Sequence, residues 1–258
     1  MLRFSANISM LFGEVELPER FEAAAQAGFK AVEIQFPYGW SQRQLAEIAW
    51  HAGVEVALIN LPGGDAQKGD RGIACLPGRV AEFRESVGKA LDYAVSLGCK
   101  RMNCLAGIAP RDADPAVLRE TYVSNLRYAA RELAGSGMTL LVEPISTLAV
   151  PGFYLNRSRD AFALLKDVGE HNLKVQYDLY HMRIMGDDLA ATISASLGSI
   201  GHMQFADVPG RHEPGTGEID FRSLFDLIDR LGYDGWIGAE YIPTGQTGDS
   251  LAWAKDYL

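Results

Sequence analysis

Four oxygen-bearing side chains follow short apolar runs in the sequence. The segment TLLVEPI at 139–145 contains Glu143, and similar runs end at Asp178, Gln204 and Glu240. A buried carboxylate is unfavourable unless it is paired, so this repetition requires an explanation. If the runs converge, three carboxylates and one amide oxygen form a site for Mg²⁺ or Mn²⁺, whereas Zn²⁺ prefers His and Cys. The pattern predicts these four residues as metal ligands, although any one of them alone is more typical of a helix cap or a loop ion pair.

Three other ionisable side chains lie at related positions. His181 follows Asp178 by three residues in DLYH, so a turn after the strand would bring it to the same place, where it could bind substrate. A single histidine is otherwise more often structural. His202 precedes Gln204 by two residues and shares its side of a strand. Glu33 ends the segment AVEI, and the sequence leaves open whether it joins the site or forms a structural pair.

A substrate that carries a carboxylate would need a guanidinium, whose planar fork binds both carboxylate oxygens. Arg71, in the segment GDRGIACLPGR, is the first choice for this role. Arg79 and Arg211 are the other candidates, and His212 is a further ionisable side chain beside Arg211. For each of the four, a solvated charge in a loop is the alternative interpretation.

Apolar runs of about four to seven residues alternate with helical patterns along the chain. Each helical pattern ends near a glycine that is predicted to take the left-handed conformation of a helix C-terminus. These glycines are Gly28, Gly53, Gly98, Gly135, Gly169, Gly198 and Gly232. With the opening run RFSANIS there are eight predicted strands, and DSLAWAKDYL is predicted as the last helix. Alternating strands and helices imply a parallel sheet, so the sequence predicts an α/β fold, a single (β/α)8 TIM barrel domain over 1–258.

The rival architecture is an open, doubly wound sheet. It is disfavoured because ANISMLFGE, after the first strand, lacks the Gly-rich turn that binds a dinucleotide. Two long segments rich in Gly and Pro, 61–78 and 206–219, follow predicted strands and should lie at the carboxyl ends of the barrel. Active sites of TIM barrels lie at that end, and long loops there are usually functional. The predicted metal ligands should therefore converge beneath these loops.

The composition restricts the class of partner. The 258 residues carry a net charge of −9 without a basic run, which argues against nucleic acid. The sequence has no apolar stretch of the roughly 18 residues that cross a membrane, and its N-terminus is a poor signal peptide. Three cysteines without CxxC spacing are typical of a reduced cytoplasmic protein, with Cys75 and Cys104 interpreted as packing residues. Trp40, expected to be exposed, is compatible with a homo-oligomer.

Several segments resemble the hydroxypyruvate isomerase family. This family belongs to the xylose-isomerase-like barrels, which also include ketose 3-epimerases and endonuclease IV. The order of Glu143, the Asp-x-x-His motif at 178–181, Gln204 and Glu240 resembles that of these barrels. The narrower resemblance spans nearly the whole chain and includes the segments GDRGIACLPGR, VEPI, QYDLYHM, HEPGTGEID and LGYDGWIGAEY.

The resemblance implies that Glu143, Asp178, Gln204 and Glu240 bind a divalent metal and that the two glutamates exchange a proton with the substrate. The implied reaction interconverts hydroxypyruvate and tartronate semialdehyde (2-hydroxy-3-oxopropanoate) through an enediolate. A 2-oxo-tetronate isomerase acting on a four-carbon acid is the alternative. Two other functions are less favoured. A ketose 3-epimerase is one of them, because the resemblance implies His at the position of Gln204 in those enzymes. A non-catalytic sugar-acid binder is the other. A hydride shift is the rival mechanism, but the sequence lacks a clear second set of metal ligands.

Overall fold

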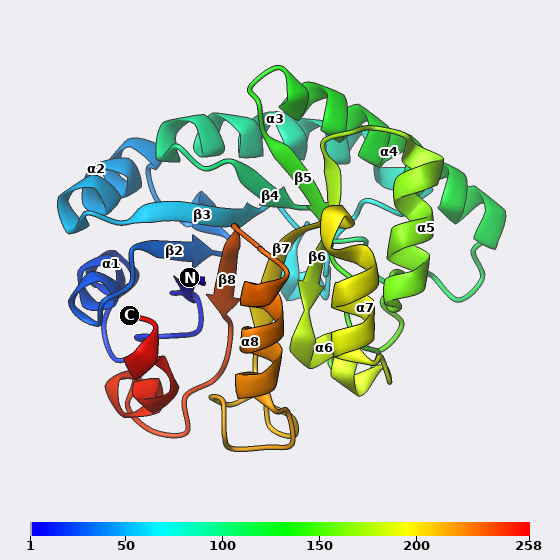
Figure 1. The fold of residues 1–258 in the computed structure, drawn as a ribbon. Coiled ribbons are helices and arrows are strands. Elements are labelled where there is room, and N and C mark those ends of the chain that lie inside the picture. Colours follow the sequence, from blue (N-terminus) through cyan, green and yellow to red (C-terminus); the bar gives the residue numbers. More distant parts are fainter. Residues whose placement is uncertain (1) are drawn as a thin grey trace.

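Eight parallel strands close into a barrel in the order of the chain (Figure 1). The computed structural model describes residues 2–258, and strand β1 pairs with both β2 and β8, which closes the sheet. The strands are β1 Arg3–Asn7, β2 Ala31–Ile34, β3 Glu55–Asn60, β4 Arg101–Asn103, β5 Thr139–Val142, β6 Leu173–Asp178, β7 Ile200–Phe205 and β8 Trp236–Ala239. The predicted (β/α)8 TIM barrel is confirmed.

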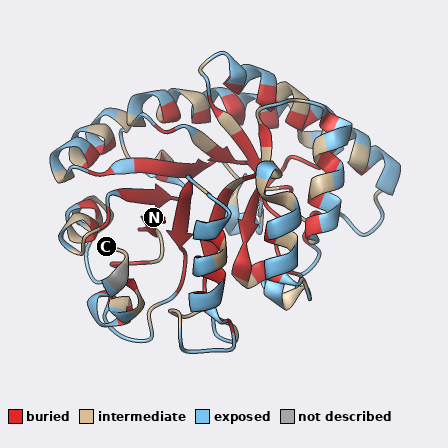
Figure 2. Ribbon diagram, in the orientation of Figure 1, coloured by how far each residue is buried: buried red, intermediate tan, exposed pale blue. Residues whose placement is uncertain are grey.

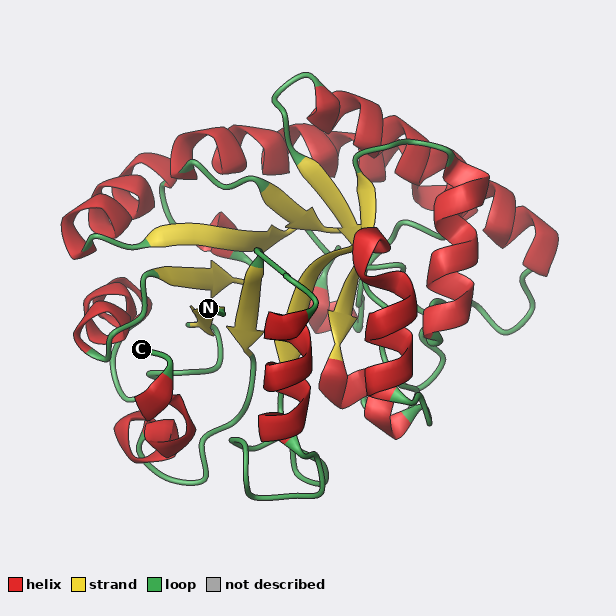
Figure 3. Cartoon of the chain, in the orientation of Figure 1, coloured by secondary structure: helices red, strands yellow, loops and turns green. Residues whose placement is uncertain are grey.

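Helices lie outside the strands and connect them (Figure 3). The α-helices are α1 Leu17–Gln26, α2 Gln42–Ala52, α3 Val80–Leu97, α4 Pro115–Ala134, α5 Ser158–Val168, α6 Leu179–Ile184, α7 Leu189–Ser196 and α8 Phe221–Arg230. Short 3₁₀ segments are η1 Pro37–Gly39, η2 Ala66–Lys68, η3 Pro77–Arg79, η4 Leu197–Ser199 and η5 Thr247–Asp256. The last helix predicted from the sequence is present, but as the 3₁₀ helix η5 rather than an α-helix. Its Trp253 packs edge-on against Phe4 and Phe205, so aromatic contacts hold it on the barrel.

The glycines predicted at helix ends are confirmed at five of seven positions. Gly28, Gly53, Gly98, Gly169 and Gly232 have φ between 65° and 103°. The prediction is wrong for Gly135, whose φ is −58°, and for Gly198, which lies within η4 without a positive φ. After α4 the sequence AGSG offers two glycines, and the chain takes the left-handed conformation at the second, Gly137, with φ of 64°.

The strands are buried on both faces, and the helices are buried on the side that faces them (Figure 2). Helix α8 shows why, because Phe221, Leu224, Phe225 and Ile228 recur at helical spacing and are all buried. The three cysteines are free and buried, which confirms the packing interpretation of Cys75 and Cys104. Trp40 is half-buried against the core rather than exposed. Among residues 2–258, no helix is both long enough and apolar enough to cross a membrane.

A polar layer crosses the barrel interior below the carboxyl ends of the strands. Glu33 of β2 is fully buried there and accepts hydrogen bonds from Ser5 Oγ at 2.7 Å and His202 Nε2 at 2.7 Å. His202 and Gln204, predicted to share one side of their strand, therefore both face the barrel interior. Gly238 of β8 leaves room for Glu33, since a Cβ at 238 would lie 2.1 Å from Glu33 Oε1. Glu33 is thus enclosed by its neighbours on several strands.

We predict that Gly238→Ala destabilises the fold by several kcal/mol, because the added methyl overlaps a buried carboxylate that cannot leave the barrel interior. Gly88→Ala is the control: Gly88 is exposed within α3, and a Cβ there would meet no atom within 4 Å. The control should gain roughly 0.5–1 kcal/mol from helix propensity. Urea denaturation of both variants measures these effects. Equal stabilities for Gly238→Ala and the parent would contradict the assigned packing of Glu33.

Candidate active site

An open cavity of about 670 Å³ lies at the carboxyl ends of the strands. The first long loop, 61–78, forms part of its wall and the second, 206–219, contributes Arg211, which confirms the predicted position of both loops. A third segment, 143–157 between β5 and α5, also lines the cavity and was not singled out from the sequence. Several polar residues at the strand ends, or in the turns that follow them, line the cavity. They are Gln35, Asn60, Glu143, Gln176, His181 and Glu240.

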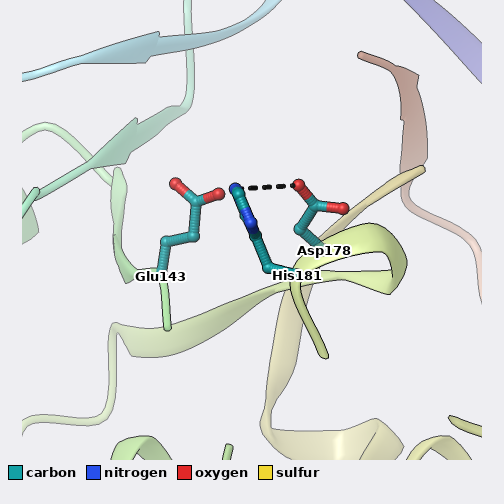
Figure 4. A group of neighbouring side chains, drawn as sticks. All are labelled: Glu143, Asp178 and His181. Carbon is teal, nitrogen blue, oxygen red and sulfur yellow. Dashed lines mark ion pairs between the residues drawn. The ribbon is translucent and has the colours of Figure 1, made fainter. Parts of the chain in front are cut away.

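Glu143, Asp178 and His181 meet on one side of this cavity (Figure 4). One ligand atom from each lies within 4.8 Å of the others, and all three side chains are buried. Glu143 follows β5 directly and accepts a hydrogen bond from Asn103 Nδ2 at 2.7 Å. Asp178 ends β6, and its Oδ1 accepts the backbone N–H of Tyr180 at 2.9 Å, which starts helix α6. This one-turn geometry places His181 beside Asp178, as its spacing predicted.

The second oxygen of Asp178 lacks a hydrogen-bond partner among the described residues, although it is buried. His181 Nε2 lies 3.6 Å away, which is too far for a good hydrogen bond. On its other side the His181 ring contacts Ser146 Oγ through Nδ1 at 3.2 Å. Burial, with Arg211 nearby, lowers the pKa of His181 well below its usual value, so the ring is neutral at neutral pH.

Glu240, which follows β8, lies across the cavity and pairs with a half-buried guanidinium. Arg211 Nη2 donates to Glu240 Oε2 at 2.7 Å and lies 4.0 Å from Asp178 Oδ2. The other oxygen of Glu240 accepts from Asn7 Nδ2 at 3.0 Å and Gln35 Nε2 at 2.6 Å. Arg211 was only one of several loop charges in the sequence, whereas the structure places it inside the cavity.

The loop that carries Arg211 is organised by Asp207, a fully buried carboxylate just after β7. Its two oxygens accept the backbone N–H groups of Val208, Gly215, Gly217 and Ile219. Gly217 is required because a Cβ there would lie 2.1 Å from the carbonyl oxygen of Val208. Arg211 itself has a φ of 61°, which is unusual for a residue other than glycine. The signal for this loop in the sequence is an aspartate followed by closely spaced glycines, but that signal does not identify which side chain points inward.

Burial, with neighbouring carboxylates, raises the pKa of all three carboxylates. Burial is the largest cause for Glu143, and Glu240 and Asp178 add to it, so its pKa lies well above the usual value. Burial raises the pKa of Asp178 to about 6 and that of Glu240 to about 7, although Arg211 opposes both shifts. The pKa of Arg211 is raised despite its own burial, because all three carboxylates favour its charge. The cavity therefore stabilises positive charge.

This donor set fits a divalent metal ion. Among the described residues, Arg211 is the cation that lies within 4.0 Å of these carboxylates. If Glu143, Asp178 and Glu240 are all ionised, one guanidinium leaves two negative charges unmatched. The unpartnered oxygen of Asp178 and the neutral ring of His181 are further available ligands. Carboxylate oxygens with one imidazole are typical of sites for Mg²⁺, Mn²⁺ or a similar ion.

Gln204, the fourth predicted ligand, lies deeper in the barrel. Its Nε2 donates to Glu33 Oε2 at 2.7 Å, and its Oε1 accepts from Gln176 Nε2 at 2.6 Å. Gln176 lines the cavity, whereas Gln204 and Asp178 are almost completely buried behind the lining residues. Glu33 therefore lies directly beneath the predicted site and contacts it through Gln204.

The other predicted cations lie at the edge of the cavity or outside it. Arg71 is exposed on the rim, where its Nη1 donates to the carbonyl oxygen of Asp70 at 2.7 Å. Arg79 pairs with Asp70 and Glu82 and does not line the cavity. His212 contacts the carbonyl oxygen of Ile242 through Nδ1 at 2.7 Å, so it joins two loops.

A parallel barrel with a carboxylate and histidine cluster at the carboxyl ends of its strands defines the structural class as a TIM barrel with a candidate metal site. The chain belongs to the family described as Xylose isomerase-like TIM barrel, which it matches over residues 21–257.

Proteins similar over the full length narrow this relationship. The hydroxypyruvate isomerase of Escherichia coli is 48% identical to this chain, and the match covers 100% of both chains. The 2-oxo-tetronate isomerase of Cupriavidus necator is 47% identical, with 100% of this chain and 99% of the relative covered. The crystal structure of a protein from Brucella melitensis described as AP endonuclease, family 2, superposes with a TM-score of 0.98 at 42% identity, covering 100% and 99% of the two chains. The resemblance to the hydroxypyruvate isomerase family is confirmed, and the named functions of the two sequence relatives support an isomerase.

We predict that chelator-treated protein becomes less stable, relative to Glu143→Gln, as the pH rises from about 4 to 8. The raised pKa values mean that the folded state binds more protons than the unfolded state in this window, so ionisation disfavours folding. Gln lacks the charge but keeps an oxygen for Asn103, so Glu143→Gln should be more stable at pH 8 by on the order of 1–3 kcal/mol. The two proteins should be nearly equal at pH 4.

Thermal unfolding across this pH range measures the difference. Glu120→Gln, which removes an exposed carboxylate on α4, is the matched control and should follow the parent at every pH. A stability difference between Glu143→Gln and the parent that does not change with pH would contradict the assigned charge repulsion.

Proposed function

We propose that the protein is an aldose–ketose isomerase that interconverts hydroxypyruvate and tartronate semialdehyde. The observation that carries this proposal is the placement of Glu143 and Glu240 on the wall of one cavity, from β5 and β8, with Asp178 and His181 between them in the order of the strands. The full-length relative named hydroxypyruvate isomerase supports the choice of substrate. The protein would act in the cytoplasm on a small hydroxy or oxo acid.

The two glutamates are proposed to move the proton. One removes a proton from C3 of hydroxypyruvate, which leaves an enediolate, and the other returns a proton to C2. The hydroxyl proton on C3 is lost as the oxygen on C2 gains one, so carbonyl and hydroxyl groups exchange places. Both glutamates line the cavity, and β5 and β8 are separated around the barrel, so the two carboxylates reach a substrate from different sides.

Glu143, Asp178, Gln204 and Glu240 are proposed to hold a divalent ion, Mg²⁺ or Mn²⁺. When bound, such an ion stabilises negative charge that develops on the oxygens of the substrate. Asp178 is suited to this role because one of its oxygens is buried without a hydrogen bond. Gln204 would contribute its amide oxygen, which already faces Gln176 at the cavity wall.

His181 and Arg71 are proposed to bind the substrate. If Ser146 Oγ donates to Nδ1 of His181, Nε2 carries the proton and can donate it to a substrate oxygen. Arg71 reaches the cavity from its rim and would bind the carboxylate of the substrate. Arg211, deeper in the cavity, would share in neutralising that carboxylate.

The second candidate is a 2-oxo-tetronate isomerase with the same mechanism. The relative from Cupriavidus necator supports it, and a cavity of about 670 Å³ has room for a four-carbon acid. A nuclease is less favoured, because a net charge of −9 would repel DNA. A ketose 3-epimerase or a non-catalytic binder is also less favoured, since two glutamates at one cavity are suited to proton transfer.

We predict that metal-loaded protein converts hydroxypyruvate in D₂O to tartronate semialdehyde that carries deuterium at C2. Glu240→Gln and Glu143→Gln should each lose at least about 100-fold in rate, because each removes one of the two proton carriers. Glu120→Gln is the control and should keep the parent rate. NMR spectroscopy follows the product and its deuterium content.

Three other results would each contradict a part of this account. Product without deuterium would favour a hydride shift. Turnover of 2-oxo-tetronate but not of hydroxypyruvate would establish the second candidate. Undiminished activity after chelation would exclude the divalent ion.

We predict that Arg71→Ala raises KM roughly tenfold and changes kcat by less than about twofold, because a charged hydrogen bond to the substrate is lost from both ground and transition states. Arg43→Ala, which removes an exposed guanidinium on α2, is the control and should leave both constants unchanged. Steady-state kinetics measures both variants. An unchanged KM for Arg71→Ala would assign the carboxylate to Arg211 instead.

A further inference from the structure

Glu33 is a buried carboxylate that the proposed proton transfer does not use. It lies in the barrel interior with no exposed surface, and four side chains donate hydrogen bonds to it. Oε1 accepts from Ser5 Oγ and His202 Nε2, each at 2.7 Å. Oε2 accepts from Gln204 Nε2 at 2.7 Å and Asn7 Nδ2 at 3.3 Å. Each oxygen therefore faces two donors, so the group acts as a carboxylate that only accepts hydrogen bonds.

An acceptor at this position determines which way the amide of Gln204 points. The two ends of a glutamine amide are nearly equal in size, so its orientation is decided by the donors and acceptors around it. Because Glu33 can only accept, the NH₂ group of Gln204 must face it, and Oε1 must face away. In the structure Oε1 faces Gln176, a residue of the cavity wall. A metal ion can bind an amide oxygen but not an NH₂ group, so this orientation decides whether Gln204 is a ligand.

We propose that Glu33 is a positioning residue that fixes the amide orientation of Gln204 and so presents its oxygen to a divalent ion. This inference rests on the proposed function, in which Gln204 is a metal ligand. The same carboxylate also holds Asn7, whose Nδ2 donates to Glu240 Oε1 at 3.0 Å. One buried group beneath the site therefore aligns two of the residues around it.

Replacing Glu33 by glutamine should reverse the orientation of Gln204 without removing volume. The oxygen of the new amide can take the place of Oε1 and accept from Ser5 and His202. Its NH₂ group then faces Gln204, which must turn its own oxygen inward to accept. Gln176 can turn with it, because its Oε1 is buried without a hydrogen-bond partner among the described residues. The fold is kept, and the NH₂ group of Gln204 now points toward the ion.

The test measures Mn²⁺ binding to the full chain, stripped of metal, by the electron paramagnetic resonance signal of free Mn²⁺. Glu33→Gln should raise the Kd at least about tenfold, as removal of groups that orient metal ligands does elsewhere. Ser5→Ala is the matched control. It removes a different donor to Glu33 and leaves Gln204 untouched, so it should lower the melting temperature but change the Kd by less than about twofold.

A double variant, Glu33→Gln with Gln204→Glu, tests the reason for the effect. A carboxylate at 204 presents oxygen in both orientations and accepts from the new amide at 33, so Mn²⁺ binding should recover to within a few-fold of the parent. The double variant also keeps one negative charge in the polar layer of the barrel interior, as in the parent. The test therefore remains valid if Glu33→Gln alone fails to fold. Circular dichroism and thermal unfolding confirm that each variant is folded.

The outcomes separate this proposal from the proposed function. Parent-like Mn²⁺ binding by folded Glu33→Gln, or a folded double variant that does not recover binding, would overturn the role of Glu33 and leave the proposed function intact. Parent-like binding by Gln204→Ala would remove Gln204 from the ligand set and overturn both the ligand assignment and the inference. A parent protein that does not bind Mn²⁺ would overturn the proposed metal site as a whole.

Discussion

The mutual repulsion of three buried carboxylates is the constraint on which the site depends. Parallel strands in a barrel bring their carboxyl ends together, so Glu143 and Glu240 line a common cavity and Asp178 lies buried beside it. Each is removed from water, and this burial is the main reason for their raised pKa values, to which neighbouring negative charge adds. Donors from neighbouring elements offset part of this cost, and Arg211 supplies a positive charge. The negative charge that Arg211 does not neutralise is the electrostatic basis for binding a divalent cation.

Two further carboxylates hold this arrangement in place without facing the cavity. Asp207 gathers four backbone N–H groups, and the loop so formed keeps Arg211 beside Glu240 in an unfavourable backbone conformation. Glu33 gathers four side-chain donors beneath the site. Both are fully buried, and both have their oxygens satisfied by several hydrogen bonds. Glycines at 217 and 238 provide the space that these two groups occupy.

The sequence was sufficient for the barrel and for most of the carboxylate cluster, because both follow from local patterns. Apolar runs that alternate with helical segments define eight strands, and a residue at the end of a strand must lie at the mouth. The position of Arg211 could not be predicted, since it depends on contacts of Asp207 with residues up to twelve positions later. The pairing of Glu33 with Gln204 spans 171 residues and depends on side-chain orientation across the barrel. The 3₁₀ form of the C-terminal segment could not be predicted either, because the hydrophobic pattern of the sequence indicates a helix but not its type.

Proton release on metal binding tests the central claim most directly. Calorimetric titration of Mn²⁺ into metal-free protein near pH 6, in buffers of different ionisation enthalpy, counts the protons displaced from the site. Because the pKa of Asp178 is raised to about 6, that of Glu240 to about 7 and that of Glu143 well above its usual value in the ion-free site, binding of one ion per chain should release about one proton or more. The apparent affinity should increase as the pH rises. Binding that releases no protons, or the absence of binding at any pH, would contradict a carboxylate cluster held ready for a cation.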